Sequence, residues 1–152
     1  RMICISEGNA TDIASIIPVM DDAFDASFGE AWTSAQCLSA LAIPDCRLLI
    51  ARSDNNVIGF SMTRWVLDTE ELLMIAVLRS SQRSNLGSLL LAAIIKHAKD
   101  NNREKLFLEV REGNKAYDFY CTSGFVPIGR RKQYYRGPDG FRPDAITMAL
   151  TI

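Results

Sequence analysis

The sequence predicts an α/β fold in which a mixed β-sheet carries helices on its faces. Short apolar runs rich in β-branched and aromatic residues alternate with segments whose apolar residues recur at helical spacing. The expected order is one strand, two helices, three strands, a helix, a strand, a helix and two final strands. The chain has 152 residues, a length that fits one hydrophobic core, so we expect a single domain over residues 1–152.

The N-terminal third is expected to form a strand and two helices. The alternating run MICIS predicts the strand. Thr11 is suited to the N-cap of a helix whose apolar residues follow at helical spacing: Ile13, Ile16, Ile17, Met20 and Phe24. Residues 33–36, TSAQ, have the form of a capping box that starts the second helix, and Pro44 ends it.

Three strands and a long helix are expected next. The runs CRLLIAR and VIGFSMTRWVL flank the turn-forming SDNN, which predicts a hairpin. EELLMIAVL is almost continuously apolar, which predicts a strand buried on both faces. The helix is expected from Leu86 to about Asp100, with one apolar face formed by Leu86, Leu89, Leu90, Ala93, Ile94 and His97.

The remaining chain is expected to add a strand, a short helix and two closing strands. KLFLEV reads as a buried strand, and NKAYDFYCTSG as a helix that ends at Gly124. The last two strands flank GPDG at residues 137–140. In GRRKQYYR the charges alternate between strand faces, so a solvated sheet edge is the simplest interpretation.

Composition narrows the class of protein. The formal net charge is −1, so no overall attraction to nucleic acid exists, and we expect no direct nucleic-acid binding. No apolar run approaches the roughly 20 residues of a membrane span, and we expect no membrane association. The four cysteines form no CxxC pair and have no histidine at metal-ligand spacing. We therefore expect a cytoplasmic protein with reduced thiols and no metal.

The polar stretch SSQRSN stands between a strand and an apolar helix. Free backbone N–H groups and the positive end of the helix dipole make such a helix start an anion site. Neither GxxxxGK[ST] nor GxGxxG is present, so the known loops for ATP or NAD do not apply. Taken alone, the stretch is equally compatible with an ordinary capped helix.

Residues 82–87, QRSNLG, resemble the pyrophosphate-binding loop Q/R-x-x-G-x-G/A of the GCN5-related N-acetyltransferases (GNAT). Further segments resemble the RimI-like branch of that family, the ribosomal-protein alanine N-acetyltransferases, in the same order from about residue 58 onward. These are IGF, ELLMIAV, LFLEVREGN, FYCTSGF, GRRKQYY and DAITMAL. The resemblance implies a GNAT fold, with a mixed sheet of about six to seven strands and about four helices.

The resemblance also implies roles for individual residues. The backbone of Ile75, Ala76 and Val77 would bind the pantetheine arm of acetyl-CoA, and Asn114 would contact the cosubstrate. Glu109 would act as general base and Tyr120 as general acid. The pyrophosphate would be wrapped by the loop residues Gln82, Arg83, Ser84, Asn85, Leu86, Gly87 and Ser88.

The chain departs from the family pattern at four places. Asn85 replaces the first loop glycine, and asparagine is the other residue that best tolerates φ > 0. Arg79 replaces a proline, and Ser88 replaces an arginine. The spacing from Asn114 to Tyr120 is one residue shorter than usual.

Each candidate also has a structural interpretation. Glu109 interrupts an apolar strand and shares a face with Phe107 and Arg111, so a structural Glu109–Arg111 pair is the alternative to a base. Tyr120 is otherwise a core aromatic residue. His97, the only histidine, lies near a helix end, where a packed or carbonyl-capping role is favoured.

The function that the resemblance implies is acetyl transfer from acetyl-CoA to the N-terminal alanine amine of a small-subunit ribosomal protein. The alternatives are another protein N-terminus, a lysine, a small amine, or a non-catalytic acetyl-CoA-binding domain. By resemblance, the strand GRRKQYYR and the hairpin residues 64–71 would border the peptide groove, where Asp68, Glu70 and Glu71 would attract a basic peptide. An ordinary charged loop is the alternative there.

Overall fold

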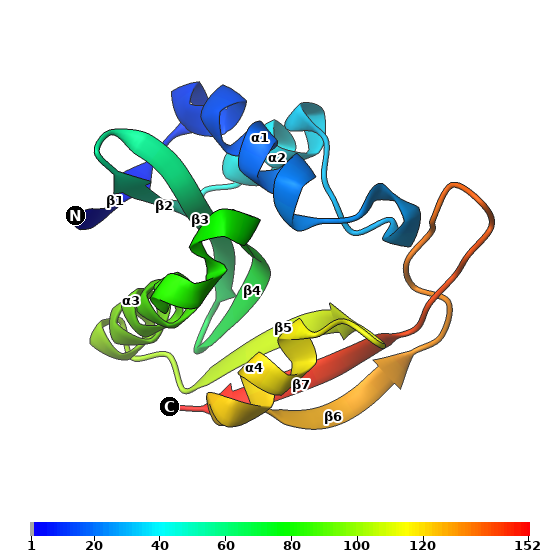
Figure 1. The fold of residues 1–152 in the computed structure, drawn as a ribbon. Coiled ribbons are helices and arrows are strands. Elements are labelled where there is room, and N and C mark those ends of the chain that lie inside the picture. Colours follow the sequence, from blue (N-terminus) through cyan, green and yellow to red (C-terminus); the bar gives the residue numbers. More distant parts are fainter. Residues whose placement is uncertain (1) are drawn as a thin grey trace.

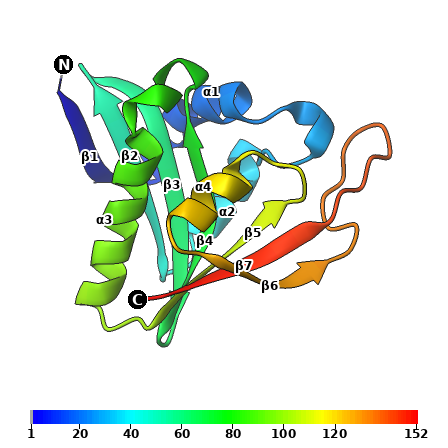
Figure 2. The ribbon, with the colours of Figure 1, turned by 60° about the horizontal axis from the view of Figure 1, so that its bottom comes forward.

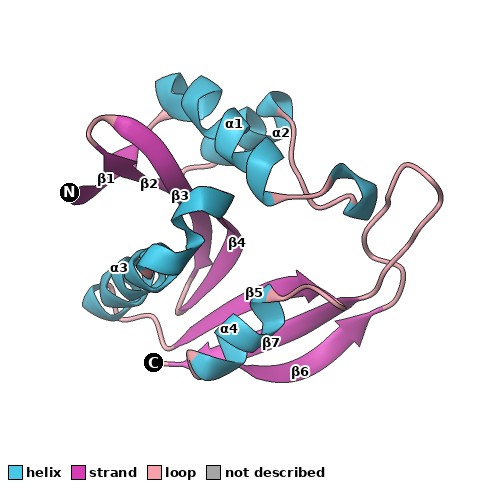
Figure 3. Cartoon of the chain, viewed as in Figure 1, coloured by secondary structure: helices cyan, strands magenta, loops and turns pink. Residues whose placement is uncertain are grey.

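The computed structural model describes residues 2–152, in which seven strands and four α-helices follow the predicted order (Figure 3). The strands are β1 (Ile3–Gly8), β2 (Cys46–Ser53), β3 (Asn56–Val66), β4 (Thr69–Val77), β5 (Lys105–Arg111), β6 (Val126–Arg131) and β7 (Ala145–Thr151). The α-helices are α1 (Ile13–Ala23), α2 (Ser34–Leu41), α3 (Leu86–Asp100) and α4 (Ala116–Thr122). Three 3-10 helices add η1 (Ala10–Asp12), η2 (Ala26–Phe28) and η3 (Arg79–Ser84). The predicted α/β class with a mixed sheet is confirmed.

The strands form one sheet in the order β1-β2-β3-β4-β5-β7-β6, and only β4 and β5 are parallel neighbours. Their pairing joins Thr69–Leu72 to Lys105–Leu108 and then stops. A register shift against β3 makes Leu73 an extra residue of β4, and a bulge of this kind bends a strand. Beyond it the two halves of the sheet diverge (Figure 1).

Helices cover both faces of the sheet. α1 and α2 pack on one face of β2–β4, and α3 and α4 lie on the other (Figure 2). In β2, Leu48 and Ile50 belong to the cluster under α1, while Leu49 and Ala51 belong to the cluster under α3. Burial on both faces explains why the β2 sequence is apolar at consecutive positions.

Two local expectations about the helices need correction. Asn9, not Thr11, provides the cap of the first helical segment, because its Oδ1 accepts from the Thr11 N–H at 2.9 Å. On α3, Leu89 is 46% exposed and Leu91 is buried in its place. Leu86, Leu90 and Ile94 are buried as predicted, so the apolar face of α3 is displaced only slightly, toward Leu91 and Ala98. The capping box at Thr33 is confirmed. Among the described residues, no helix is long and apolar enough to cross a membrane.

A buried ionisable cluster lies under the C-terminal end of α3. Glu70 of β4 is 0% exposed, and its carboxylate lies 3.9 Å from both Nδ1 of His97 and Nε of Arg103. Burial raises the pKa of Glu70. Burial lowers the pKa of His97, and the nearby charges of Arg47 and Arg103 lower it further against the weaker opposite effects of Glu7 and Asp100. His97 is thus packed near a helix end, as expected.

Replacement of His97 by Gln is expected to reduce the loss of unfolding free energy that occurs when the pH falls below neutral. Because folding lowers the pKa of His97, the unfolded chain takes up a proton near the ordinary value of 6.5 that the folded chain does not bind. The free energy of unfolding should therefore fall as the pH drops below this value. Urea unfolding at about pH 7.5 and about pH 5.5 should show a smaller drop for His97→Gln than for the native chain. Equal drops would contradict this assignment, since the opposing effect of Glu70 is common to both proteins.

Candidate active site

A cleft of about 850 Å³ occupies the space where β4 and β5 diverge. β4 and the start of α3 form one wall, and β5 and α4 form the other. The segment from the end of α1 to Trp32 and the β6–β7 loop close its far end, through Phe28, Glu30, Tyr134 and Tyr135. The cleft therefore follows directly from the early end of the parallel pairing.

The β4 wall of the cleft presents backbone groups. Ile75, Ala76 and Val77 line the cleft, and their only strand partner within residues 2–152 is β3 on the opposite edge. Alternate residues of a strand direct their N–H and C=O groups to opposite edges, so some of these groups face the cleft, as in the addition of a strand to a sheet. The Val77 carbonyl already accepts from Nε2 of Gln82 at 3.3 Å.

The start of α3 presents a second set of backbone groups. Asn85 adopts φ 58° and ψ 21°, so it takes the left-handed conformation that a glycine would take at this turn. Its side chain does not cap the helix. Leu89 donates the first i→i−4 bond, to the Asn85 carbonyl at 3.0 Å, which leaves the N–H groups of residues 86–88 for an anion.

The predicted cosubstrate loop lies at this end of the cleft. Every predicted site residue lines the cleft except Arg83, Ser84 and Leu86. Arg83 and Ser84 are exposed in η3, and the Leu86 side chain is 0% exposed in the core. Arg79 also lines the cleft and is tied to Asp22, because its N–H bonds the Asp22 carboxylate and its Nε bonds the Asp22 carbonyl, at 2.7 Å each.

Glu109 is held by two donors from neighbouring strands. Arg131 Nε lies 2.7 Å from its Oε1, and Thr147 Oγ1 donates to its Oε2 at 2.9 Å. The Glu109 side chain is only 14% exposed and lines the cleft. Arg111 does not pair with it, so the Glu109–Arg111 alternative is wrong.

Tyr120 is both a packed aromatic residue and part of the cleft wall. Its ring lies 5.4 Å from that of Phe119 and 5.7 Å from that of Phe125, and its side chain borders the cleft. Burial, with a smaller contribution from the Glu30 charge, raises the pKa of Tyr120 well above its ordinary value. The hydroxyl therefore keeps its proton at neutral pH.

A network that sequence reasoning missed lies beside Tyr120. Glu30, in the segment between η2 and α2, accepts from Arg111 Nε at 3.0 Å and from Asn114 Nδ2 at 2.8 Å. Asn114 Oδ1 accepts from the Ala116 N–H at 2.8 Å, at the start of α4. The Arg111 guanidinium lies 3.7 Å from the centre of the Phe28 ring. Glu30 is separated from its partners by about eighty residues, so no local pattern marks it.

Two loops meet across the far end of the cleft (Figure 1). A Cβ atom on Gly137 would lie 2.2 Å from the Ser27 carbonyl oxygen, and one on Gly29 would lie 2.2 Å from the facing backbone. Tyr135, in the same loop, donates from its hydroxyl to the Glu109 carbonyl at 3.3 Å. Burial raises the pKa of Tyr135. The segment GRRKQYYR is thus not merely a solvated edge.

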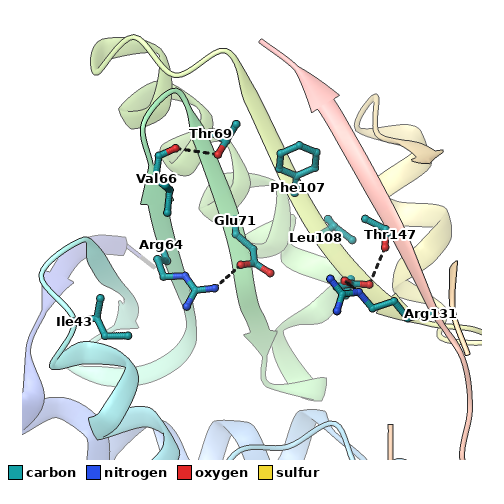
Figure 4. Close-up of a pocket in the computed structure, with 10 residues that line it drawn as sticks. Ile43, Arg64, Val66, Thr69, Glu71, Phe107, Leu108, Arg131 and Thr147 are labelled. Atoms are coloured by element: carbon teal, nitrogen blue, oxygen red, sulfur yellow. Dashed lines mark hydrogen bonds and ion pairs between the residues drawn. The ribbon is translucent and has the colours of Figure 1, made fainter. Parts of the chain in front are cut away.

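A second cavity of about 420 Å³ adjoins the cleft (Figure 4). Arg64 and Glu71 face each other on the β3–β4 side, joined by a 2.8 Å bond, and Arg131 and Thr147 lie on the other side. Glu109 borders both cavities. The expectation that Glu70 helps to attract a basic peptide is wrong, because Glu70 is fully buried.

The sequence model of the "Acetyltransferase (GNAT) family" matches residues 15–125. The chain belongs to this family. It is an acetyl-CoA-dependent N-acetyltransferase of the RimI-like branch, and the expected GNAT fold is confirmed.

Relatives and solved structures agree with this assignment. The acetyltransferase is 41% identical over 99 residues to the ribosomal protein bS18-alanine N-acetyltransferase of Haemophilus influenzae, covering 65% of this chain and 68% of that one. It is similar to the crystal structure of the ribosomal-protein-S18-alanine N-acetyltransferase from Escherichia coli, with a TM-score of 0.89, 32% identity and coverage of 99% and 94%. The PaiA N-acetyltransferase of Thermoplasma acidophilum, solved with coenzyme A, shares the fold at a TM-score of 0.80 and 17% identity, with full coverage of both chains.

Gly137→Ala is expected to separate the two loops of the acetyltransferase. The added methyl group has no room beside the Ser27 carbonyl, and overpacking of this kind costs roughly 1–3 kcal/mol of unfolding free energy. Urea unfolding measures the loss. Gly140→Asn in the same loop is the control, since no atom lies within 4 Å of a Cβ there and asparagine tolerates the positive φ. Equal stability of the two variants would show that the loops do not need this close approach.

Proposed function

We propose that this chain transfers acetyl from acetyl-CoA to the α-amine of a protein N-terminus, with the N-terminal alanine of the small-subunit ribosomal protein bS18 as acceptor. Relatives named for that reaction are 41% identical to the chain, which supports the acceptor. The observation that carries the chemistry is that Glu109 and Tyr120 line the same cleft as the free edge of β4 and the open start of α3. A ribosomal acceptor would place the reaction in the cytoplasm, performed by residues 1–152 as a single domain.

The wall of the cleft formed by β4 and the start of α3 is suited to binding acetyl-CoA. The backbone of Ile75, Ala76 and Val77 binds the amide groups of the pantetheine arm, and the amides of the loop 82–88 bind the pyrophosphate. Asn114 keeps one amide hydrogen and one oxygen lone pair for the cosubstrate, because Glu30 and Ala116 each use only one of its positions. No group of three or more metal-binding side chains occurs among the described residues, and the reaction needs none.

Two proton transfers complete the reaction. Glu109 accepts the proton of the attacking amine, and Tyr120 donates to the sulfur of the departing thiolate. The buried Tyr120 hydroxyl is protonated at neutral pH, as a proton donor must be. An α-amine, with a pKa of about 8, is roughly a tenth neutral at pH 7, so Glu109 needs to be only a moderate base.

The joined loops favour a chain end as acceptor. They close the far end of the cleft from both sides at Gly29 and Gly137. A peptide end can pass beneath such a bridge, whereas an internal lysine brings backbone on both sides of it. The geometry therefore favours an N-terminal amine over the lysine alternative.

Acceptor choice is tested with two peptides and a polyamine. We expect mass spectrometry to show addition of one acetyl group to a peptide with a free N-terminal alanine from bS18. The same peptide with a blocked N-terminus and a lysine in its interior should remain unmodified, and so should a small polyamine. Acetylation of the blocked peptide would overturn the N-terminal assignment in favour of lysine.

Glu109→Gln and Tyr120→Phe are each expected to lower turnover by about 100-fold or more, because each removes one proton-transfer group. Binding of acetyl-CoA should survive, seen as a stabilisation of about 2.7 kcal/mol at 100 times its dissociation constant. Glu104→Gln and Tyr117→Phe are matched controls outside the cleft and should keep native turnover. Native turnover in a cleft variant would exclude that residue from proton transfer.

A further inference from the structure

Three neighbouring strands bring four positions together on one face of the sheet. Glu109 of β5 lies opposite Thr147 of β7, and Thr147 lies opposite Gly129 of β6. Residues opposite each other in antiparallel strands point to the same face, and so does Arg131, two residues beyond Gly129. Because Gly129 has no side chain, the long Arg131 side chain can run back across it to Glu109.

Both oxygens of Glu109 are engaged by this arrangement. Thr147 Oγ1 bonds Oε2 at 2.9 Å, and Arg131 Nε lies 2.7 Å from Oε1. Each carboxylate oxygen has two lone pairs, so each keeps one for an incoming proton. The contacts fix the orientation of the carboxylate without blocking it, at the place where the cleft and the second cavity adjoin.

The contact with Arg131 joins a mostly exposed guanidinium to a mostly buried carboxylate. Arg131 is 63% exposed, and an exposed ion pair contributes little to stability, so packing does not explain it. Its guanidinium also lies 5.6 Å from the centre of the Tyr134 ring, another residue of the cleft wall. Arg131 and Thr147 appear together at the edge of the second cavity in Figure 4.

We propose that Arg131 is a positioning residue for acetyl transfer, which together with Thr147 holds the Glu109 carboxylate in line with the attacking amine. This inference rests on the proposed role of Glu109 as base. Arg131 does not line the cleft that would hold acetyl-CoA. It acts through Glu109, because the contact restricts the Glu109 carboxylate to the orientation from which it can accept the proton.

Arg130 provides a matched control on the same strand. Its side chain points to the other face, where it pairs with Glu112 and with Asp144, the latter at 2.9 Å. Arg130→Met and Arg131→Met remove the same charge from adjacent positions of β6. Only the second removes a contact with Glu109.

The experiment compares steady-state kinetics of Arg131→Met, Arg131→Lys and Arg130→Met on the N-terminal alanine peptide. We expect Arg131→Met to lower kcat by about tenfold, a loss typical of a misplaced catalytic group, with an unchanged KM for acetyl-CoA and an unchanged melting temperature. Arg131→Lys, which keeps a cationic donor, should recover most of the turnover, and Arg130→Met should match the native enzyme. In a Glu109→Gln background, Arg131→Met should cause no further loss.

The outcomes separate this inference from the proposed function. Native kcat in Arg131→Met, while Glu109→Gln is inactive, would overturn the role of Arg131 and leave the base in place. An equal loss in Arg130→Met would also overturn it, because the effect would then be one of general charge. Native turnover in Glu109→Gln would overturn the proposed base itself. If Arg131→Met does not fold, Arg131→Gln replaces it in the same comparison.

Discussion

The limited pairing of β4 with β5 is the feature on which the rest of the structure depends. These strands are parallel neighbours only as far as Leu72 and Leu108, and the extra residue Leu73 then bends β4 away. Hydrogen-bonding groups that would otherwise join the two strands become available inside the molecule. The same separation leaves room for the cleft, which shares Glu109 with the second cavity.

Long-range contacts hold this open geometry in place. The Glu30 carboxylate links the N-terminal region to Arg111 at the end of β5 and to Asn114 before α4. The close approach of the two loops at Gly29 and Gly137 joins the same N-terminal region to the β6–β7 loop. The diverging halves of the sheet are therefore connected again at the far end of the cleft. The position of α4, which carries Tyr120, depends on this connection.

Three carboxylates that line the cleft and the adjoining cavity each form an ion pair with one arginine. Glu109 faces Arg131, Glu30 faces Arg111, and Glu71 faces Arg64 in the adjoining cavity. Glu30 and Glu109 are mostly buried, where a carboxylate without a partner would be costly, and their pairings lower that cost. Since the partners lie on different strands and loops, each pair also fixes the relative position of two segments.

Much of the site could be predicted from sequence, because the relevant signals are local. The order of strands and helices follows from hydrophobic periodicity, and the turn at Asn85 follows from the tolerance of asparagine for positive φ, which its φ of 58° confirms. The resemblance of the loop and of LEVR to known segments located Glu109 and the start of α3 on the cleft wall.

Only the tertiary structure decided which side chains face one another. Arg111 is two residues from Glu109 along the strand, yet Glu109 pairs with Arg131, which β7 brings beside it. No periodic sequence pattern predicts the role of Glu30, because its partners lie about eighty residues away. The sequence alone determines local conformation through short-range sterics and periodicity, whereas these pairings depend on strand order and register, which are set by the packing of the whole chain.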